Sequence, residues 1–210
     1  MHKKKPFFIT FEGIEGSGKS YQSLKLFRKL KLLKVDPIKT REPGGTEGAE
    51  IIRKIILSGS ENKFTPTTDT LLYLAARNEH VQKLIKPSLK KKKIIICDRF
   101  IDSTIAYQVS GKSVNKNLVT HIHNNILAGV KPNITFLLTV KIESAMKRIN
   151  KRKHKNRYDK FNKEFYKKVQ KTFIRNAKLN KKRYFIIDNS ENSNKVENII
   201  FNIIKKKLSL

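Results

Sequence analysis

The sequence predicts an α/β fold in which helices cover both faces of a five-stranded parallel sheet. Two observations support this prediction. Five short apolar runs are typical of strands buried on both faces of a sheet: residues 5–11, 37–40, 94–97, 134–140 and 184–187. Between and after these runs, apolar side chains recur at helical spacing, and strands that alternate with helices form parallel sheets.

Each predicted element has a local reason. The first apolar run stops at Glu12-Gly13, where a turn begins, and the apolar residues from Leu24 to Leu33 then recur every three positions within a helix over 18–33. The turn-forming residues 43–45 end the second strand, and Asp98 ends the third. The later helices are expected at residues 46–57, 67–86, 114–128, 142–150, 160–180 and 194–208.

The length and the cysteine content limit the class of protein. A chain of 210 residues fits one domain with a sizeable core, so we expect a single unit over residues 1–210. The one cysteine, Cys97, excludes an internal disulfide and a thiolate metal cluster, which indicates a reducing compartment. No apolar run approaches the ~20 residues of a membrane-spanning helix, and the basic N-terminus does not lead into a signal peptide. We therefore expect a cytoplasmic protein with no membrane partner.

The chain is strongly basic, with 47 Lys and Arg against 17 Asp and Glu and a formal net charge of +30. Such a charge is common in nucleic-acid-binding proteins. The excess is mostly lysine, however, in a chain that is also rich in Ile and Asn and lacks Trp, which is the composition that AT-rich codons produce. We favour this compositional explanation and expect no obligate nucleic-acid partner, although a basic surface attracts small polyanions such as nucleotides.

Residues 13–20 match the pattern G-x-x-x-x-G-K-[ST] of a phosphate-binding P-loop, directly after a predicted strand and at the start of a predicted helix. Glycines let the backbone approach phosphates closely, and the freed N–H groups and the helix N-terminus bind the oxyanions. Lys19 would reach the β- and γ-phosphates of ATP, and the Ser20 hydroxyl would ligate Mg²⁺. A plain connecting turn is the alternative. The residues expected to bind ATP in this loop are Gly13, Ile14, Glu15, Gly16, Ser17, Gly18, Lys19 and Ser20.

A P-loop alone leaves GTPases, motor proteins, ATPases and small-molecule kinases open. Four further segments narrow the choice: Thr40-Arg41-Glu42-Pro43-Gly44-Gly45-Thr46, Tyr73-Leu74-Ala75-Ala76-Arg77, the segment from Asp98-Arg99 to Tyr107-Gln108, and the basic segment from Arg148 to Asp159. In this order, over about residues 7–190, they resemble the thymidylate kinase family, and the P-loop resembles its bacterial type. The resemblance implies a P-loop NTPase fold with a monophosphate-binding region at about 41–108 and a short lid at about 148–160.

Two arginines are candidates for binding the phosphate of dTMP. Arg41 and Arg99 follow neighbouring predicted strands at the carboxyl edge of the sheet, where ligands bind in open α/β folds. Two guanidinium groups at this edge would clamp the acceptor phosphate through bidentate, charge-assisted bonds. The alternative is that either arginine forms a structural ion pair with Glu42 or Asp98.

Two carboxylates have separate expected roles. Asp98 leaves the sheet near the expected position of Mg²⁺ and the γ-phosphate, where a strand-end Asp of P-loop enzymes orients the metal or its waters. A capping role is the alternative. The expected metal ligands are therefore Ser20 and Asp98. The resemblance implies that Glu15, inside the P-loop, accepts a hydrogen bond from the 3′-hydroxyl of the deoxyribose.

The resemblance also implies a binding site for the thymine base. Tyr73 and Arg77 lie four apart on one helix face, so that the ring would stack on thymine and the guanidinium would bond a base carbonyl. Family members usually have Phe at the position of Tyr73, and an aromatic residue in a helical stripe is ordinarily a core residue. Thr104 and Gln108 would meet the base edge, and Tyr107 would pack beside the sugar, where it excludes a 2′-hydroxyl.

Arginines are concentrated after the fourth predicted strand, at Arg148, Arg152 and Arg157. A basic lid that closes over ATP neutralises charge on the transferring phosphoryl group and expels water. We expect Arg157 to approach the phosphates and Arg148 to lie nearer the adenine. Solvated surface charge is the alternative for all three residues. Asn156 replaces an Asp that is frequent in the lid of the family.

The predicted function is transfer of the γ-phosphoryl group of ATP to dTMP, which gives dTDP and ADP in the synthesis of dTTP, with Mg²⁺ as cofactor. The resemblance implies a homodimer. The alternatives are a P-loop kinase of another nucleotide or a nucleoside, and a nucleic-acid-binding protein switched by ATP. The expected catalytic residues are Lys19, Asp98, Arg99 and Arg157, with Arg148 added to the ATP site; the expected dTMP-binding residues are Glu15, Arg41, Tyr73, Arg77, Arg99, Thr104, Tyr107 and Gln108.

Overall fold

The computed structural model describes residues 5–153, 156–191 and 193–210. Within these residues, five strands form one sheet in the order β2-β3-β1-β4-β5, and every neighbouring pair is parallel. The five-stranded parallel sheet and the P-loop NTPase fold predicted from the sequence are confirmed. The strands are β1 (Phe7–Glu12), β2 (Pro37–Arg41), β3 (Ile94–Asp98), β4 (Ile134–Thr139) and β5 (Tyr184–Asp188).

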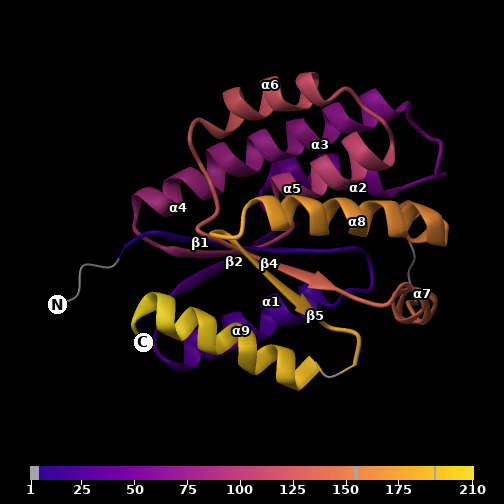
Figure 1. Cartoon of the computed structure of the whole chain (residues 1–210). Helices are drawn as coiled ribbons and strands as arrows, with labels where there is room; N and C mark the ends of the chain where they lie inside the picture. Colours follow the sequence, from indigo (N-terminus) through magenta and orange to yellow (C-terminus); the bar gives the residue numbers. More distant parts are fainter. Residues whose placement is uncertain (1–4, 154–155, 192) are drawn as a thin grey trace.

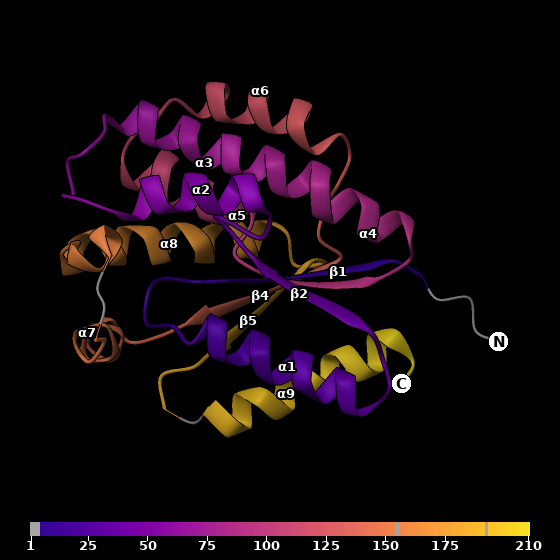
Figure 2. The ribbon, with the colours of Figure 1, turned by 180° about the vertical axis from the view of Figure 1, so that it is seen from behind.

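Helices cover both faces of this sheet (Figures 1 and 2). On one face lie α1 (Lys19–Leu32) and α9 (Ser193–Leu208), which pack on each other. A larger group covers the opposite face, and α7 (Ile142–Asn150) lies beyond the end of β4. The helices of the larger group are α2 (Glu47–Leu57), α3 (Pro66–His80), α4 (Lys86–Lys90), α5 (Ile101–Thr104), α6 (Lys116–Leu127) and α8 (Lys163–Leu179).

The central strand β1 shows why the strands are apolar throughout. Phe8 is buried with Val81 and Ile95 under the larger helical group, whereas Ile9 and Phe11 are buried with residues of α1 and α9. Successive strand residues point to opposite faces, so a strand covered on both sides needs apolar residues at nearly every position. This agrees with the uninterrupted apolar runs in the sequence.

Two helical segments differ from the sequence prediction. The helix expected at 67–86 consists of α3, a π-helical turn η1 (Val81–Ile85) and the short α4. The segment after β3 was not predicted as a helix, but it forms α5 and a π-helix η2 (Ile105–Gly111). Ile101, Ile105 and Val109 recur four apart in this segment, but they are only partly buried, and polar residues such as Thr104 and Gln108 occupy buried positions. The segment matters because π-helical turns often occur at functional sites.

The parallel sheet brings the ends of several strands to one edge. Residues 13–18 form the loop between β1 and α1, Arg41 ends β2, and Asp98 ends β3 next to Arg99. Neighbouring strands pair in register there, with Phe11 opposite Asp98 and Asp98 opposite Arg41. None of the helices formed by the described residues is long and apolar enough to span a membrane.

Candidate active site

The loop after β1 has the close-packed backbone of a phosphate-binding turn. Gly16 has a φ of 73°, and a Cβ atom there would lie 2.6 Å from the carbonyl oxygen of Ala145 on α7. Only glycine adopts this conformation at such a close approach. The Asn189 amide donates to the carbonyl oxygen of Ser17 at 2.7 Å, so the segment after β5 supports the loop. The loop is therefore fixed from two sides.

A cavity of about 270 Å³ opens beside this loop, at the carboxyl edge of the sheet. It joins side chains that are far apart in the sequence, which is the usual arrangement of a ligand site in an open α/β fold. Most residues that the sequence analysis assigned to chemistry or to dTMP line this one cavity: Glu15, Lys19, Ser20, Arg41, Tyr73, Arg77, Asp98, Arg99, Thr104, Tyr107 and Gln108.

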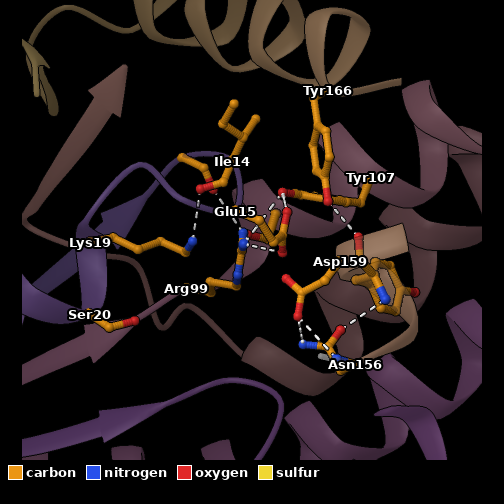
Figure 3. A network of polar contacts seen from close by, with 12 residues as sticks. Ile14, Glu15, Lys19, Ser20, Arg99, Tyr107, Asn156, Asp159 and Tyr166 are labelled. Atoms are coloured by element: carbon orange, nitrogen blue, oxygen red, sulfur yellow. Dashed lines mark hydrogen bonds and ion pairs between the residues drawn. The ribbon is translucent and has the colours of Figure 1, made fainter. Parts of the chain in front are cut away.

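Glu15 and Arg99 form an ion pair at the centre of the site, with an oxygen–nitrogen distance of 2.6 Å (Figure 3). Tyr107 donates to the other oxygen of Glu15, and Arg99 also donates to the carbonyl oxygen of Gly13 at 2.9 Å. Burial raises the pKa of Glu15, but Arg99 and Lys19 outweigh it and the net pKa is lowered. Arg99 has a φ of 72°, an uncommon conformation for a residue with a side chain. The carboxylate is thus held ionised between two cations.

Lys19 points back into the loop and donates to the carbonyl oxygen of Ile14 at 3.0 Å (Figure 3). Burial lowers its pKa to about 8, and the positive charge of Arg99 contributes. An anionic ligand beside the ammonium group would favour its charged form. Lys19 is therefore suited to bind a polyphosphate.

Ser20 and Asp98 meet at the edge of the cavity, where the Ser20 hydroxyl donates to Oδ2 of Asp98. The other oxygen, Oδ1, is buried and has no partner among the described residues. A hydroxyl next to a carboxylate with an unused oxygen is a ligand set that suits a hydrated magnesium ion. The predicted metal ligands are thus in contact with each other.

Arg41 is not paired with Glu42 or Asp98, the two structural partners considered from the sequence. It donates to both oxygens of Glu50 on α2, at 3.1 and 3.0 Å, and its side chain remains half exposed at the cavity. Arg53 lies one helical turn beyond Glu50 and also lines the cavity, where it donates to the carbonyl oxygen of Pro43 at 2.6 Å. Two guanidinium groups therefore reach this end of the cavity from β2 and α2.

Arg77 lines the cavity but is only 2% exposed, and its guanidinium is bonded on every side. Nε donates to Glu42 at 2.8 Å, and Nη2 donates to the Phe100 carbonyl oxygen at 3.0 Å. Nη1 donates to Thr104 at 2.6 Å and to His123 at 2.7 Å. An arginine Nη atom has two hydrogens, and both of those on Nη1 face an acceptor among the described residues.

Aromatic rings form the wall beside Arg77. The ring of Tyr158 meets the rings of Tyr73 and Tyr107 edge to face, at centroid distances of 5.9 and 6.2 Å. The Tyr158 hydroxyl lies 3.3 Å from Nε2 of Gln108, which donates to it. Tyr73 thus belongs to the cavity as well as to the partly buried edge of the core. A flat ligand ring would find an aromatic surface at this wall.

The placement of Arg157 does not agree with its expected position beside the phosphates. Arg157 lines neither the central cavity nor the smaller cavity beside Gly16 and Arg148, and it is 1% exposed. Its guanidinium pairs with the fully buried Asp69 of α3 and donates to the carbonyl oxygen of Ile56 at the end of α2. It belongs to the short 3₁₀ helix η3 (Arg157–Lys160), in which Arg157, Tyr158 and Asp159 are buried and Lys160 is exposed.

Arg152, unlike Arg157, lies beside the P-loop cavities. It lines both the central cavity and a second one of about 200 Å³ on the outer side of the P-loop. Its Nη1 atom lies 2.5 Å from the carboxylate of Asp159. The same carboxylate accepts hydrogen bonds from Asn156 (Figure 3). His154 and Lys155, which the predicted lid includes, lie outside the described residues.

Arg148 lines the second cavity together with Gly16, Gly18 and Tyr21. It donates to three backbone carbonyl oxygens, those of Gly16, Asn189 and Ser190, at 2.9 to 3.1 Å. These bonds hold its guanidinium plane against the outer side of the P-loop. Arg148 therefore lies beside the loop, outside the lining of the central cavity.

Comparisons with known proteins agree with this geometry. Residues 11–200 match the family model described as "Thymidylate kinase". The chain belongs to the thymidylate kinase family. Thymidylate kinases from Sulfurihydrogenibium sp. and from Mycoplasma capricolum are 39% and 41% identical to it, over 96% of this chain and 98% and 95% of theirs. The crystal structure of thymidylate kinase from Ehrlichia chaffeensis is 34% identical, with a TM-score of 0.78 over 95% of this chain and 99% of the other.

Membership of the thymidylate kinase family confirms the predicted enzyme class. The chain is a kinase of nucleotide synthesis that phosphorylates dTMP with ATP as phosphate donor. The comparisons give no support to a different nucleotide substrate or to a nucleic-acid-binding protein.

Sequence reasoning missed several residues that the fold brings to this thymidylate kinase site. Arg53 and Leu57 come from α2, and Tyr158 comes from η3. In a chain with 47 Lys and Arg, one arginine on a helix gives no signal. His123 is not among the residues that line the central cavity, but it contacts Arg77, and no sequence motif includes it.

Proposed function

We propose that the γ-phosphoryl group passes directly from ATP on the P-loop to the phosphate of dTMP in the central cavity. The observation that carries this proposal is the continuity of that cavity, which joins Lys19 of the P-loop to Arg99 and Tyr73 on its opposite side. The acceptor phosphate is already ionised at neutral pH, so the transfer needs no strong general base. Catalysis consists of positioning and charge neutralisation.

The dTMP phosphate binds between guanidinium groups. Arg99, Arg41 and Arg53 supply positive charge at the phosphate end of the cavity, and the first of these is fixed by Glu15. Planar guanidinium groups recognise a phosphate in two-bond geometry better than lysines do. The sugar lies near Glu15 and Tyr107, and the base lies between the aromatic wall and Thr104.

Magnesium is held by Ser20 and Asp98. The contact between these side chains and the unpartnered Oδ1 of Asp98 support this assignment. When bound, the ion neutralises negative charge on the β- and γ-phosphates. Lys19 binds the same phosphates from inside the loop, and Arg148 supports the loop from outside.

Arg152 is the arginine of the lid that reaches the transferring phosphoryl group. Its position at both cavities and its ion pair with Asp159 support this role. This ion pair holds the Arg152 guanidinium towards the phosphates. A positive charge that is already in place stabilises the negative charge of the transferring phosphoryl group. Arg157 anchors the lid segment through its buried ion pair with Asp69 on α3.

We propose further that the whole chain acts as one domain in a cytoplasmic homodimer. Ile51 and Ile55 lie four apart on α2 and are 56% and 41% exposed, which favours a partner surface on this helix. Sedimentation equilibrium of the wild type and of the I51E/I55E variant tests the dimer. A variant that sediments like the wild-type dimer would exclude this surface.

A coupled assay of ADP release against dTMP, dUMP, UMP, dGMP and thymidine tests the proposed transfer. The expected result is preference for dTMP, no dependence on added DNA, and loss of nearly all turnover in Lys19→Ala with the fold retained. Normal turnover in that variant, or DNA-stimulated ATP hydrolysis without dTMP-dependent ADP release, would refute the proposed transfer.

A further inference from the structure

Glu12 is a fully buried carboxyl group that none of the roles assigned above uses. It ends β1 and is 0% exposed. Both of its oxygens bind the segment that follows β3: Oε1 accepts from the backbone N–H of Phe100 at 2.8 Å, and Oε2 accepts from the Ser103 hydroxyl at 2.6 Å. Ser103 lines the central cavity, whereas Glu12 does not. Glu12 therefore contacts the wall of the cavity without reaching the ligand.

The Ser103 hydroxyl joins Glu12 to Arg99. Nη1 of Arg99 donates to Oγ of Ser103 at 3.0 Å and to the carbonyl oxygen of Gly13 at 2.9 Å, and Nη2 donates to Glu15 at 2.6 Å. Among the described residues, no acceptor is bonded to Nε of Arg99. These bonds fix the guanidinium by its two Nη atoms and leave the Nε hydrogen for a ligand in the cavity.

The same carboxyl group also holds the turn that contains Arg99. Arg99 has a φ of 72°, a conformation that residues with a side chain rarely adopt and that surrounding contacts must maintain. Its own N–H donates to the carbonyl oxygen of Phe11 at 2.9 Å, and the next N–H along the chain, that of Phe100, donates to Glu12. Glu12 thus fixes the backbone after Arg99 and, through Ser103, one end of the guanidinium.

The contact between Glu12 and Ser103 does not depend on the charge of Glu12. An ionised carboxylate accepts from the hydroxyl, and a protonated carboxyl group donates to it; in both cases Oγ of Ser103 keeps a lone pair for Arg99. Burial and the negative charge of Asp102 raise the pKa of Glu12 to about 8, so both forms occur near neutral pH. What Glu12 contributes to Arg99 is therefore a pair of hydrogen bonds, which need no negative charge.

We propose that Glu12 is a positioning residue for phosphoryl transfer, whose bonds to Phe100 and Ser103 fix Arg99 in the orientation that binds the acceptor phosphate. The acceptor phosphate must lie in line with the γ-phosphate, so a displaced Arg99 lowers kcat as well as the affinity for dTMP. This inference rests on the proposed binding of the dTMP phosphate by Arg99.

Two substitutions of Glu12 separate its hydrogen bonds from its charge. Glu12→Gln keeps the length of the side chain, with an oxygen that accepts from Phe100 and an amide that donates to Ser103, but it cannot be ionised. Glu12→Asp keeps the carboxyl group but is one methylene shorter, so it does not reach both partners. Ser103→Ala removes only the link to Arg99, and it provides a second test if Glu12→Asp folds poorly.

Asp102→Ala is the matched control for loss of stability. Asp102 is a second carboxyl group of the same segment and is 6% exposed. It pairs with Arg183 at 2.8 Å, does not line the cavity and, among the described residues, has no hydrogen bond to Arg99. Its removal therefore tests whether the loss of any buried carboxyl group next to Ser103 impairs the enzyme.

The readouts are kcat, KM for dTMP, KM for ATP and Tm, with the kinetics measured where every variant is folded. We expect Glu12→Asp to lower kcat about tenfold and to raise KM for dTMP about fivefold, because a small misplacement of a positioning group has effects of this order while Glu15 still holds Nη2. KM for ATP should not change. Glu12→Gln should recover the wild-type kcat and KM, and Asp102→Ala should lower Tm alone.

A double-mutant cycle tests whether Glu12 acts through Ser103. Ser103→Ala should lower kcat by about the same factor as Glu12→Asp, and the double variant should lose no more than the more impaired single variant, because residues of one network are not additive. Losses in kcat/KM for dTMP that multiply in the double variant would mean that the two residues act separately and would overturn the inference.

The inference is also overturned if Glu12→Asp changes only Tm, or if Asp102→Ala lowers kcat to the same extent. If Glu12→Gln is as impaired as Glu12→Asp, the negative charge matters instead of the hydrogen bonds, and the inference is wrong. Arg99→Ala is measured first: an unchanged KM for dTMP in that variant would refute the proposed phosphate site itself, whatever the Glu12 variants show.

Discussion

Replacing Arg157 with methionine tests whether this residue is an anchor or a catalytic group. The substitution leaves Asp69, which is fully buried, with Lys112 at 2.9 Å and the Tyr158 hydroxyl at 2.5 Å as remaining partners. It also removes the donor to the Ile56 carbonyl oxygen. Breaking a buried ion pair costs about 3–5 kcal/mol. Because Lys112 still compensates part of the charge, we expect about 3 kcal/mol for Arg157→Met, the lower end of that range.

Arg152→Ala is the matched comparison, because the Arg152 side chain is 39% exposed. An ion pair with one exposed partner contributes at most about 1 kcal/mol. For a chain of this size each kcal/mol shifts Tm by about 2–4 °C, so we expect a fall of about 6–12 °C for Arg157→Met and less than about 4 °C for Arg152→Ala. The order reverses in catalysis, where Arg152→Ala should lower kcat about 10³-fold, the lower end for arginines that stabilise phosphoryl transfer.

Differential scanning calorimetry and the ADP-release assay, both at saturating substrates, measure the two effects. The assay is run at least 15 °C below the lower Tm, so that loss of folded enzyme does not count as loss of kcat. We expect kcat of Arg157→Met within tenfold of the wild type. If Arg157→Met keeps the wild-type Tm and loses 10³-fold in kcat, the residue contacts the phosphates and the reasoning is wrong.

Three further predictions concern titration and metal binding. Burial lowers the pKa of Lys19 to about 8. Because ATP binding needs the charged form of Lys19, the ATP affinity measured by calorimetry should fall as the pH rises through about 8. An ATP affinity that does not change with pH would contradict this prediction. Burial and the negative charge of Asp102 raise the pKa of Glu12 to about 8. The free energy of unfolding, measured by urea titration, should therefore fall as the pH rises from about 5 to 8. In Glu12→Gln this dependence of the unfolding free energy on pH should be lost. Asp98→Asn should raise the Mg²⁺ concentration for half-maximal activity about 10- to 100-fold; an unchanged Mg²⁺ requirement would remove Asp98 from the metal site.

The amino-acid sequence alone determined the sheet and the P-loop site. Apolar runs that end at Glu12 and Asp98 are local signals, because a strand covered on both faces must be apolar at nearly every position. A parallel sheet then brings Lys19, Arg41 and Arg99 to one edge whatever the details of packing. This is why most of the expected site residues line one cavity.

Only the tertiary structure decided which arginine of the basic segment lines the cavities and what fixes Arg77. Arg152 and Arg157 both precede a helix in a basic segment, and nothing in their local sequence separates them. The difference arises because Asp69 on α3, which is 88 residues from Arg157 in the sequence, binds the Arg157 guanidinium. Likewise, His123 meets Arg77 only because α6 packs beside α3. Such pairings depend on contacts between distant helices, which no spacing along the chain encodes.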